Sequence, residues 1–249
     1  MNNNSTRTRR SAPITMTDLS DHDGPIWVIT MAGMRTVCIS GFGKISWGAA
    51  IKCEELGARV VTLSGPDGYI FDPDGVRGRK IDFLLRMIAS NRDRIQDYAD
   101  EYGVEFVAGK KPWEVPCDLA LPCATQNDLS IADAQGLVEN GCRYVVEATN
   151  MSCVPDAIDY FQQRGVILVP AKAGNIGGVL SSTFEYLLQF GHFNSFTEQD
   201  ELLRSLVVRV HEFCLRTART VGFPTNYVIG ANVASFCRVA EAMLDQGVV

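Results

Sequence analysis

Short apolar runs alternate with stretches of helical spacing over the first two thirds of the chain. Runs of three or four mainly apolar residues predict strands at 37–39, 60–63, 69–71, 104–107, 118–121, 144–147 and 166–169. Between them, apolar residues recur every three or four positions and predict helices at about 44–56, 77–102, 131–140 and 154–164. This alternation predicts an α/β fold with a doubly wound, mostly parallel sheet that is covered by helices on both faces.

A glycine turn follows the first predicted strand. Gly41-Phe42-Gly43 leads directly into a helical stretch and then a second strand, which is the order of the Rossmann-type dinucleotide-binding unit. Gly41 lets the chain turn sharply, and Gly43 leaves room for a pyrophosphate near the helix N-terminus. The third motif position is Ser46. A nicotinamide or flavin nucleotide is predicted, while S-adenosylmethionine, or no nucleotide at all, remain alternatives for the turn taken alone.

The pattern changes to helices alone after residue 179. Helices are predicted at about 179–190, 198–220 and 227–246. We therefore expect a Rossmann domain at 31–190 with a C-terminal helical extension of the same domain at 191–249. Residues 1–30 are rich in Asn, Ser, Thr and Arg without hydrophobic periodicity, which predicts a disordered tail.

Polar residues gather where four predicted strands end. The clusters lie at 64–67, 122–127, 147–151 and 172–178. Ligands of open α/β sheets bind beyond the carboxyl ends of the strands. Although Asn and Thr in loops are often only turn formers, four clusters at equivalent strand ends predict a single binding crevice.

Composition narrows the classes of partner. The net charge is −6, which argues against nucleic acid or an anionic membrane as a partner, and no apolar run is long enough to cross a bilayer. The eight cysteines include no C-x-x-C pair and only three histidines are present, so neither a disulfide framework nor a metal site is predicted. We expect a cytoplasmic protein; the arginines at 7, 9 and 10 also fit an organellar transit peptide, which the sequence favours less.

Several separated motifs together resemble a known family. Gly41-Phe42-Gly43, the segment 62–70 (TLSGPDGYI), the segment 122–127 (PCATQN) and Gly230-Ala231-Asn232 are similar to the cofactor-binding half of hexameric glutamate dehydrogenases. The resemblance covers about 33–249. It implies NAD(P)-dependent oxidative deamination of L-glutamate to 2-oxoglutarate and ammonia. The alternative is a non-catalytic NAD-binding or subunit-interaction protein derived from that family.

The resemblance assigns roles to individual residues. Asn150 and Asn175 are expected to hold the nicotinamide ribose and carboxamide, and Ser182 the side-chain carboxylate of the substrate. Amide side chains suit a carboxamide because each offers both a donor and an acceptor. The predicted cofactor-binding residues are Gly41, Phe42, Gly43, Lys44, Ser64, Asp67, Thr125, Asn150 and Asn175.

The family's catalytic lysine and aspartate belong to an N-terminal domain that has no match here. Residues 1–32 contain no lysine, so we predict no catalytic residue in this chain. The expected partners are that missing domain or further copies of the chain. The last predicted helix carries an apolar stripe (Val228, Val233, Phe236, Val239, Ala240, Met243 and Leu244) that would then be partly exposed.

The segment after the second strand bears on the choice of cofactor. NAD-specific folds commonly place an acidic residue about 20 residues after the glycines, where it binds the adenosine ribose. Asp67 is the only carboxylate in 64–67, and no Lys or Arg follows before Arg77. We therefore predict NAD rather than NADP.

Overall fold

The computed structural model describes residues 36–91, 94–190 and 195–247. The predicted tail at 1–30 lies outside these residues. Within them, one seven-stranded sheet has the order β4-β3-β2-β1-β5-β6-β7. The strands are β1 (Thr36–Ser40), β2 (Arg59–Gly65), β3 (Gly68–Phe71), β4 (Glu105–Ala108), β5 (Leu119–Pro122), β6 (Tyr144–Val146) and β7 (Ile167–Val169).

Five of these strands run parallel. β2, β1, β5, β6 and β7 pair in parallel, whereas β3 is antiparallel to both β2 and β4. The predicted mostly parallel α/β sheet is confirmed. Because β3 reverses the chain twice, the carboxyl end of β4 lies at the same edge of the sheet as the carboxyl end of β2.

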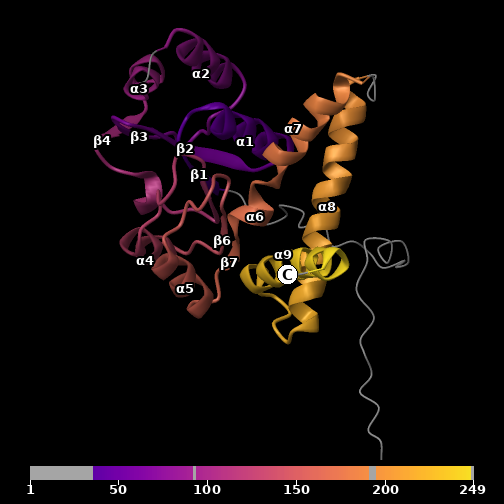
Figure 1. Cartoon of the computed structure of the whole chain (residues 1–249). Coiled ribbons are helices and arrows are strands. Elements are labelled where there is room, and N and C mark those ends of the chain that lie inside the picture. Colours follow the sequence, from indigo (N-terminus) through magenta and orange to yellow (C-terminus); the bar gives the residue numbers. More distant parts are fainter. Residues whose placement is uncertain (1–35, 92–93, 191–194, 248–249) are drawn as a thin grey trace, which may run out of the picture.

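Helices cover both faces of the sheet (Figure 1). The described helices are α1 (Lys44–Glu55), α2 (Arg79–Ala89), α3 (Gln96–Tyr102), α4 (Ile131–Glu139), α5 (Pro155–Gln163), α6 (Ala171–Gly174), α7 (Ile176–Leu188), α8 (Phe196–Thr220) and α9 (Tyr227–Gln246). Alternate residues of β1 point to opposite faces: Val37 and Ile39 pack in the core beneath α1, α2 and α3, while Cys38 packs in the core beneath α4 and α5.

The predicted helix at 77–102 was wrong as a single element. α2 ends at Ala89, and α3 begins only at Gln96. The carboxylate of Asp67 accepts hydrogen bonds from the backbone N–H groups of Ile95 (3.2 Å) and Gln96 (3.1 Å). A residue on the β2–β3 turn therefore supplies acceptors at the start of α3, a contact that helical periodicity cannot reveal. The helix ends as expected, at Gly103 in the left-handed conformation.

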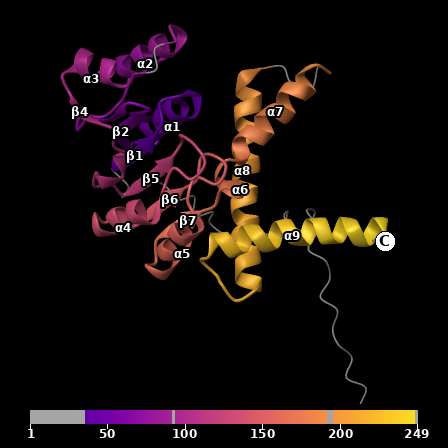
Figure 2. The same cartoon turned by 60° about the vertical axis from the view of Figure 1, so that its left-hand side comes forward.

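The C-terminal helices pack against the β7 edge of the sheet. Cys214 of α8 and the α9 residues Tyr227 and Ala231 are buried together beside Ile167 and Val169. Beyond this contact α9 projects away from the sheet (Figure 2).

The outer part of α9 exposes its apolar stripe, as predicted. Phe236 is 71% exposed, Val239 60% and Leu244 78%. No helix among the described residues is both long enough and apolar enough to span a bilayer.

Candidate functional site

The glycine turn after β1 is built from two glycines with different requirements. Gly41 has φ +79°, and a Cβ there would lie 2.8 Å from Oγ of Ser46 and 3.1 Å from the carbonyl oxygen of Cys123. Only glycine fits this position. At Gly43 a Cβ would meet no atom within 4 Å. The fold itself therefore does not require a glycine at 43, and the open space beside it is available to a ligand.

The N-terminus of α1 faces that open space without a protein cap. Gly43 is its N-cap, no side chain caps the helix, and its first turn contains no acidic residue. The first N–H groups of a helix have no partner within the helix, so they attract an anion. Ser46 is buried and donates to the carbonyl oxygen of Ser40 at 3.2 Å, which holds α1 close to the end of β1.

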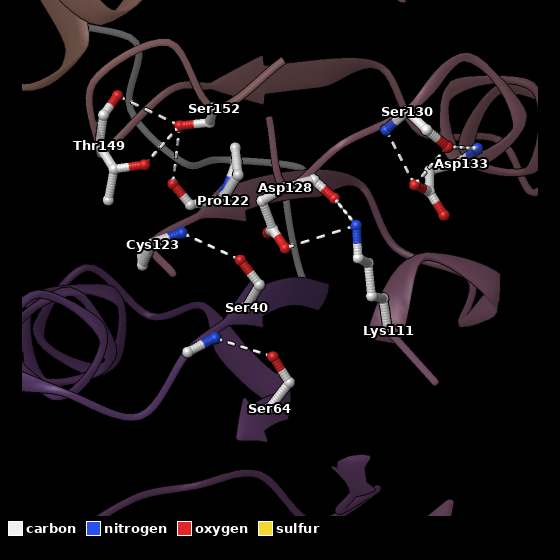
Figure 3. Close-up of polar contacts among 11 residues, drawn as sticks. Ser40, Ser64, Lys111, Pro122, Cys123, Asp128, Ser130, Asp133, Thr149 and Ser152 are labelled. Carbon is white, nitrogen blue, oxygen red and sulfur yellow. Dashed lines mark hydrogen bonds and ion pairs between the residues drawn. The ribbon is translucent and has the colours of Figure 1, made fainter. Parts of the chain in front are cut away.

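Buried hydroxyl groups tie together the loops around the turn (Figure 3). Oγ of Ser64 accepts from the N–H of Gly41 at 2.8 Å, and Oγ of Ser40 accepts from the N–H of Cys123 at 3.1 Å. Oγ of Ser152 donates to the carbonyl oxygen of Pro122 at 3.4 Å. Since these bonds join the ends of β1, β2, β5 and β6, the strand-end loops form one supported rim.

A cavity of about 850 Å³ lies on the β2 side of the turn; we call it the β2-side cavity. Five predicted residues line it, namely Gly41, Phe42, Gly43, Ser64 and Thr125. Its lining also includes residues that were not predicted, among them Pro66, Lys110, Lys111, Cys123 and Asp128.

The two lysines reach this cavity through the antiparallel part of the sheet. Gly68 pairs with Ala108, and the N–H of Gly109 donates to the carbonyl oxygen of Asp67 at 2.8 Å. This pairing brings Lys110 and Lys111 beside the β2–β3 turn. A Lys-Lys pair directly after a predicted strand was the only sequence signal for them.

Asp128 is a buried carboxylate in the wall of the β2-side cavity. Nζ of Lys111 donates to its main-chain oxygen and lies 3.8 Å from Oδ1 (Figure 3). Burial raises the pKa of the Asp128 carboxyl above its ordinary value, and the nearby charge of Lys111 opposes that shift.

Asp67 has a different partner from the one predicted. Both of its carboxylate oxygens are engaged by the N–H groups at the start of α3, and the residue does not line the cavity, although its neighbours Pro66 and Gly68 do. Its contact with an adenosine ribose stays a prediction.

A second cavity, of about 570 Å³, lies on the β6 side of the turn; we call it the β6-side cavity. Nδ2 of Asn175 donates to Oδ1 of Asn150 at 2.6 Å within its wall. This bond leaves Nδ2 of Asn150 as a donor and Oδ1 of Asn175 as an acceptor for a ligand. The remaining lining residues are Ile45, Ala148, Thr149, Gly174, Gly177, Gly178 and Val179.

Glu147, which follows β6, positions both asparagines. Its side chain is buried, Oε1 accepts from the N–H of Cys153 at 2.7 Å, and Oε2 accepts from the N–H of Ala171 at 2.8 Å. One carboxylate thus joins the loop that carries Asn150 to the start of α6, which leads to Asn175. The sequence placed Glu147 in a polar cluster without indicating this role.

Two other predicted residues lie outside the cavity walls. Lys44 is exposed at the first position of α1, although its neighbour Ile45 lines the β6-side cavity. Ser182 is exposed on α7, four residues after Gly178, so the two share one face of that helix. No group of three or more His, Cys, Asp or Glu side chains in the described part of the chain could hold a metal ion.

The N-terminus of α1 therefore lies between two cavities. Gly43 lines the first cavity, and Ile45, one residue beyond the start of α1, lines the second. The arrangement suits an elongated ligand with an anionic centre, one half of which meets the donor and acceptor of the asparagine pair.

Comparison with known proteins agrees with this architecture. The NAD-specific glutamate dehydrogenase of Bacteroides fragilis (strain YCH46) is 49% identical over 217 residues, which are 86% of this chain and 49% of the relative. The NADP-specific glutamate dehydrogenase of Escherichia coli (strain K12) is 41% identical over 218 residues, or 87% of this chain and 48% of the relative. A solved glutamate dehydrogenase structure superposes with a TM-score of 0.83 at 42% identity, covering 87% of this chain and 49% of that one.

The chain thus spans about half the length of the relatives it matches. The family model for Glutamate/Leucine/Phenylalanine/Valine dehydrogenase matches residues 28–247. This match extends over both cavities and all three C-terminal helices. The chain belongs to the Glutamate/Leucine/Phenylalanine/Valine dehydrogenase family.

Proposed function

We propose that the chain binds NAD across the two cavities and serves as the cofactor-binding half of a glutamate dehydrogenase. The observation that carries the proposal is the uncapped N-terminus of α1 between the β2-side cavity and the Asn150–Asn175 pair. The N–H groups of α1 would hold the pyrophosphate, with the adenosine in the β2-side cavity and the nicotinamide in the β6-side cavity.

The residues of the β6-side cavity fit a nicotinamide. The free donor of Asn150 and the free acceptor of Asn175 match the oxygen and the amino group of a carboxamide. When bound, the nicotinamide supplies the hydride acceptor for oxidation of an amino acid. The protein's part on this side of the cleft is to orient the ring and to cover one of its faces with Ile45 and Val179.

Substrate and proton transfer require further groups. None of the residues that line the β6-side cavity is titratable, and deamination of glutamate needs a positioned acid or base. We infer that Ser182, on the same face of α7 as Gly178, contacts the side-chain carboxylate of L-glutamate or 2-oxoglutarate, while the proton-transferring groups come from outside this cavity. NAD is proposed over NADP because several of the similar relatives are named NAD-specific.

Calorimetric titration of the purified chain with NAD tests the proposal. We expect saturable binding of NAD and, more weakly, of 5′-AMP, since 5′-AMP fills only the β2-side cavity. The matched variants are Asn150→Ala in the β6-side cavity and Asn140→Ala on the exposed end of α4. The first should weaken NAD binding and the second should not. Absence of binding by both NAD and 5′-AMP would refute the proposed function.

A further inference from the structure

The adenosine end of the cleft carries a cation that the local sequence does not show. This inference rests on the proposed function, because it concerns the same nucleotide. The turn between β2 and β3 is where dinucleotide-binding folds hold the adenosine ribose. Lys110 lines the cavity beside this turn, because the adjoining Gly109 donates from its N–H to the carbonyl oxygen of Asp67 at 2.8 Å.

The carboxylate expected to disfavour a phosphate on this ribose is directed elsewhere. Asp67 accepts from the N–H groups of Ile95 and Gln96 and does not line the cavity. An acidic residue discriminates against a ribose 2′-phosphate only when it faces the ribose. Here two N–H donors hold the carboxylate at the start of α3.

Lys110 is available to a ligand because its present partner is weakly held. Nζ of Lys110 lies 3.0 Å from Oε2 and 3.1 Å from Oε1 of Glu114. The two side chains are 59% and 49% exposed, and ion pairs of this kind contribute only about 0–1 kcal/mol. Glu114 would keep its hydrogen bond from the hydroxyl of Tyr69, at 2.8 Å, if Lys110 turned to a phosphate.

Lys111 has a separate role in the same wall. Its Nζ donates to the main-chain oxygen of Asp128 and lies near the buried carboxylate of that residue. Because Lys111 offsets the buried charge of Asp128, Lys110 is the better placed of the two for an added anion.

We propose that Lys110 forms a subsite for a phosphate on the adenosine ribose, so that the cleft accepts NADP as well as NAD. A lysine and a phosphate dianion form a charge-assisted hydrogen bond, which is stronger than the exposed carboxylate pair it replaces. The segment 64–76 contains no cation; β4 supplies one from 43 positions further along the chain than Asp67.

The test is a set of calorimetric titrations of the full chain with NAD, NADP, 5′-AMP and adenosine 2′,5′-bisphosphate. We expect NADP to bind within about tenfold of NAD. Lys110→Ala should weaken NADP and the bisphosphate by about tenfold, the size expected for one hydrogen bond to a charged group. Binding of NAD and 5′-AMP should not change in this variant.

Two further variants sharpen the result. Lys52→Ala is the matched control, because Lys52 also pairs with an exposed glutamate, Glu55 at 2.6 Å, but lies outside both cavities. It should leave all four affinities unchanged. Glu114→Gln removes the competing charge while an amide oxygen can still accept from Tyr69, so it should tighten NADP binding.

The outcomes separate this inference from the proposed function. Binding of NAD without NADP, or an equal loss of both in Lys110→Ala, would overturn the phosphate subsite and leave the proposed function intact. Failure of NAD and 5′-AMP to bind at all would overturn both proposals.

Discussion

Asn175 donates from its side-chain amide to Oδ1 of Asn150 at 2.6 Å, although 25 residues separate the two in sequence. The pair joins the loop after β6 to the short helix after β7. Each amide uses one of its groups in this bond, so the remaining donor and acceptor have fixed positions. Preorganised polar groups of this kind lose little freedom when a ligand binds.

Replacement of either asparagine is expected to weaken binding of the nicotinamide half alone. Asn150→Ala or Asn175→Ala removes one ligand contact and leaves its neighbour without its partner. We expect about a tenfold loss of NAD affinity, which corresponds to one hydrogen bond. Titration with 5′-AMP is the internal control, since this fragment does not reach the β6-side cavity. Equal loss of NAD and 5′-AMP affinity would contradict the assignment of the two cavities.

The two glycines of the turn are expected to respond differently to alanine. Gly41→Ala forces a side chain into the left-handed region and against Ser46 and the Cys123 carbonyl, which should lower the free energy of unfolding by about 2 kcal/mol. Gly43→Ala adds a methyl group in open space, so stability should hold while affinity for NAD falls. Urea unfolding and calorimetry measure the two effects. A stable Gly43→Ala chain with undiminished NAD affinity would mean that no pyrophosphate lies there.

Glu147 is expected to support both stability and binding. Its two oxygens each accept one backbone N–H in a buried position. Glu147→Gln replaces one acceptor by a donor that faces an N–H group, and we expect a loss of about 2 kcal/mol in unfolding free energy. Binding of NAD should weaken as Asn150 and Asn175 lose their support. The exposed Glu139 provides the control: Glu139→Gln should change neither quantity, and an equal effect of both substitutions would argue against the role of Glu147.

Local sequence determined the central part of the site, and long-range contacts determined the rest. The turn at 41–43 follows from a strand, two glycines and a helix in direct succession, so it was predictable. By contrast, the cap that Asp67 provides for α3 and the approach of Lys110 both depend on β3 running antiparallel. Periodicity predicts that a strand exists at 69–71 but gives no information about its direction. The cofactor argument from the sequence therefore considered only the cations near in sequence to Asp67.

The helical extension shows the same division. The spacing at 227–246 predicted α9 at its observed bounds. It did not reveal that His211 of α8 contacts the hydroxyl of Tyr227 between the two helices. Such a pairing depends on the packing of two helices, which neither helix encodes alone.

Stability is expected to fall at mildly acidic pH through His211. Burial lowers the pKa of its imidazole below the ordinary value, and the charge of Glu212 opposes this shift. The unfolded chain therefore binds a proton more readily than the folded chain, so this contribution to stability is complete above about pH 6.5 and is lost as the pH falls toward the folded pKa. The unfolding free energy, measured by urea titration across this range, should decline less in His211→Gln. An identical decline in the variant would exclude His211 as the source.

The exposed stripe of α9 is expected to make the chain self-associate. Phe236, Val239 and Leu244 present apolar side chains along the part of the helix that projects from the sheet (Figure 2). Contiguous apolar surface of this kind favours association because contact removes it from water. Light scattering should show an average mass that rises with protein concentration. The double substitution Phe236→Ser with Leu244→Ser should reduce this rise, whereas Leu56→Ser, at an exposed leucine that follows α1, should not. A monomer at all concentrations would show that this face does not drive association.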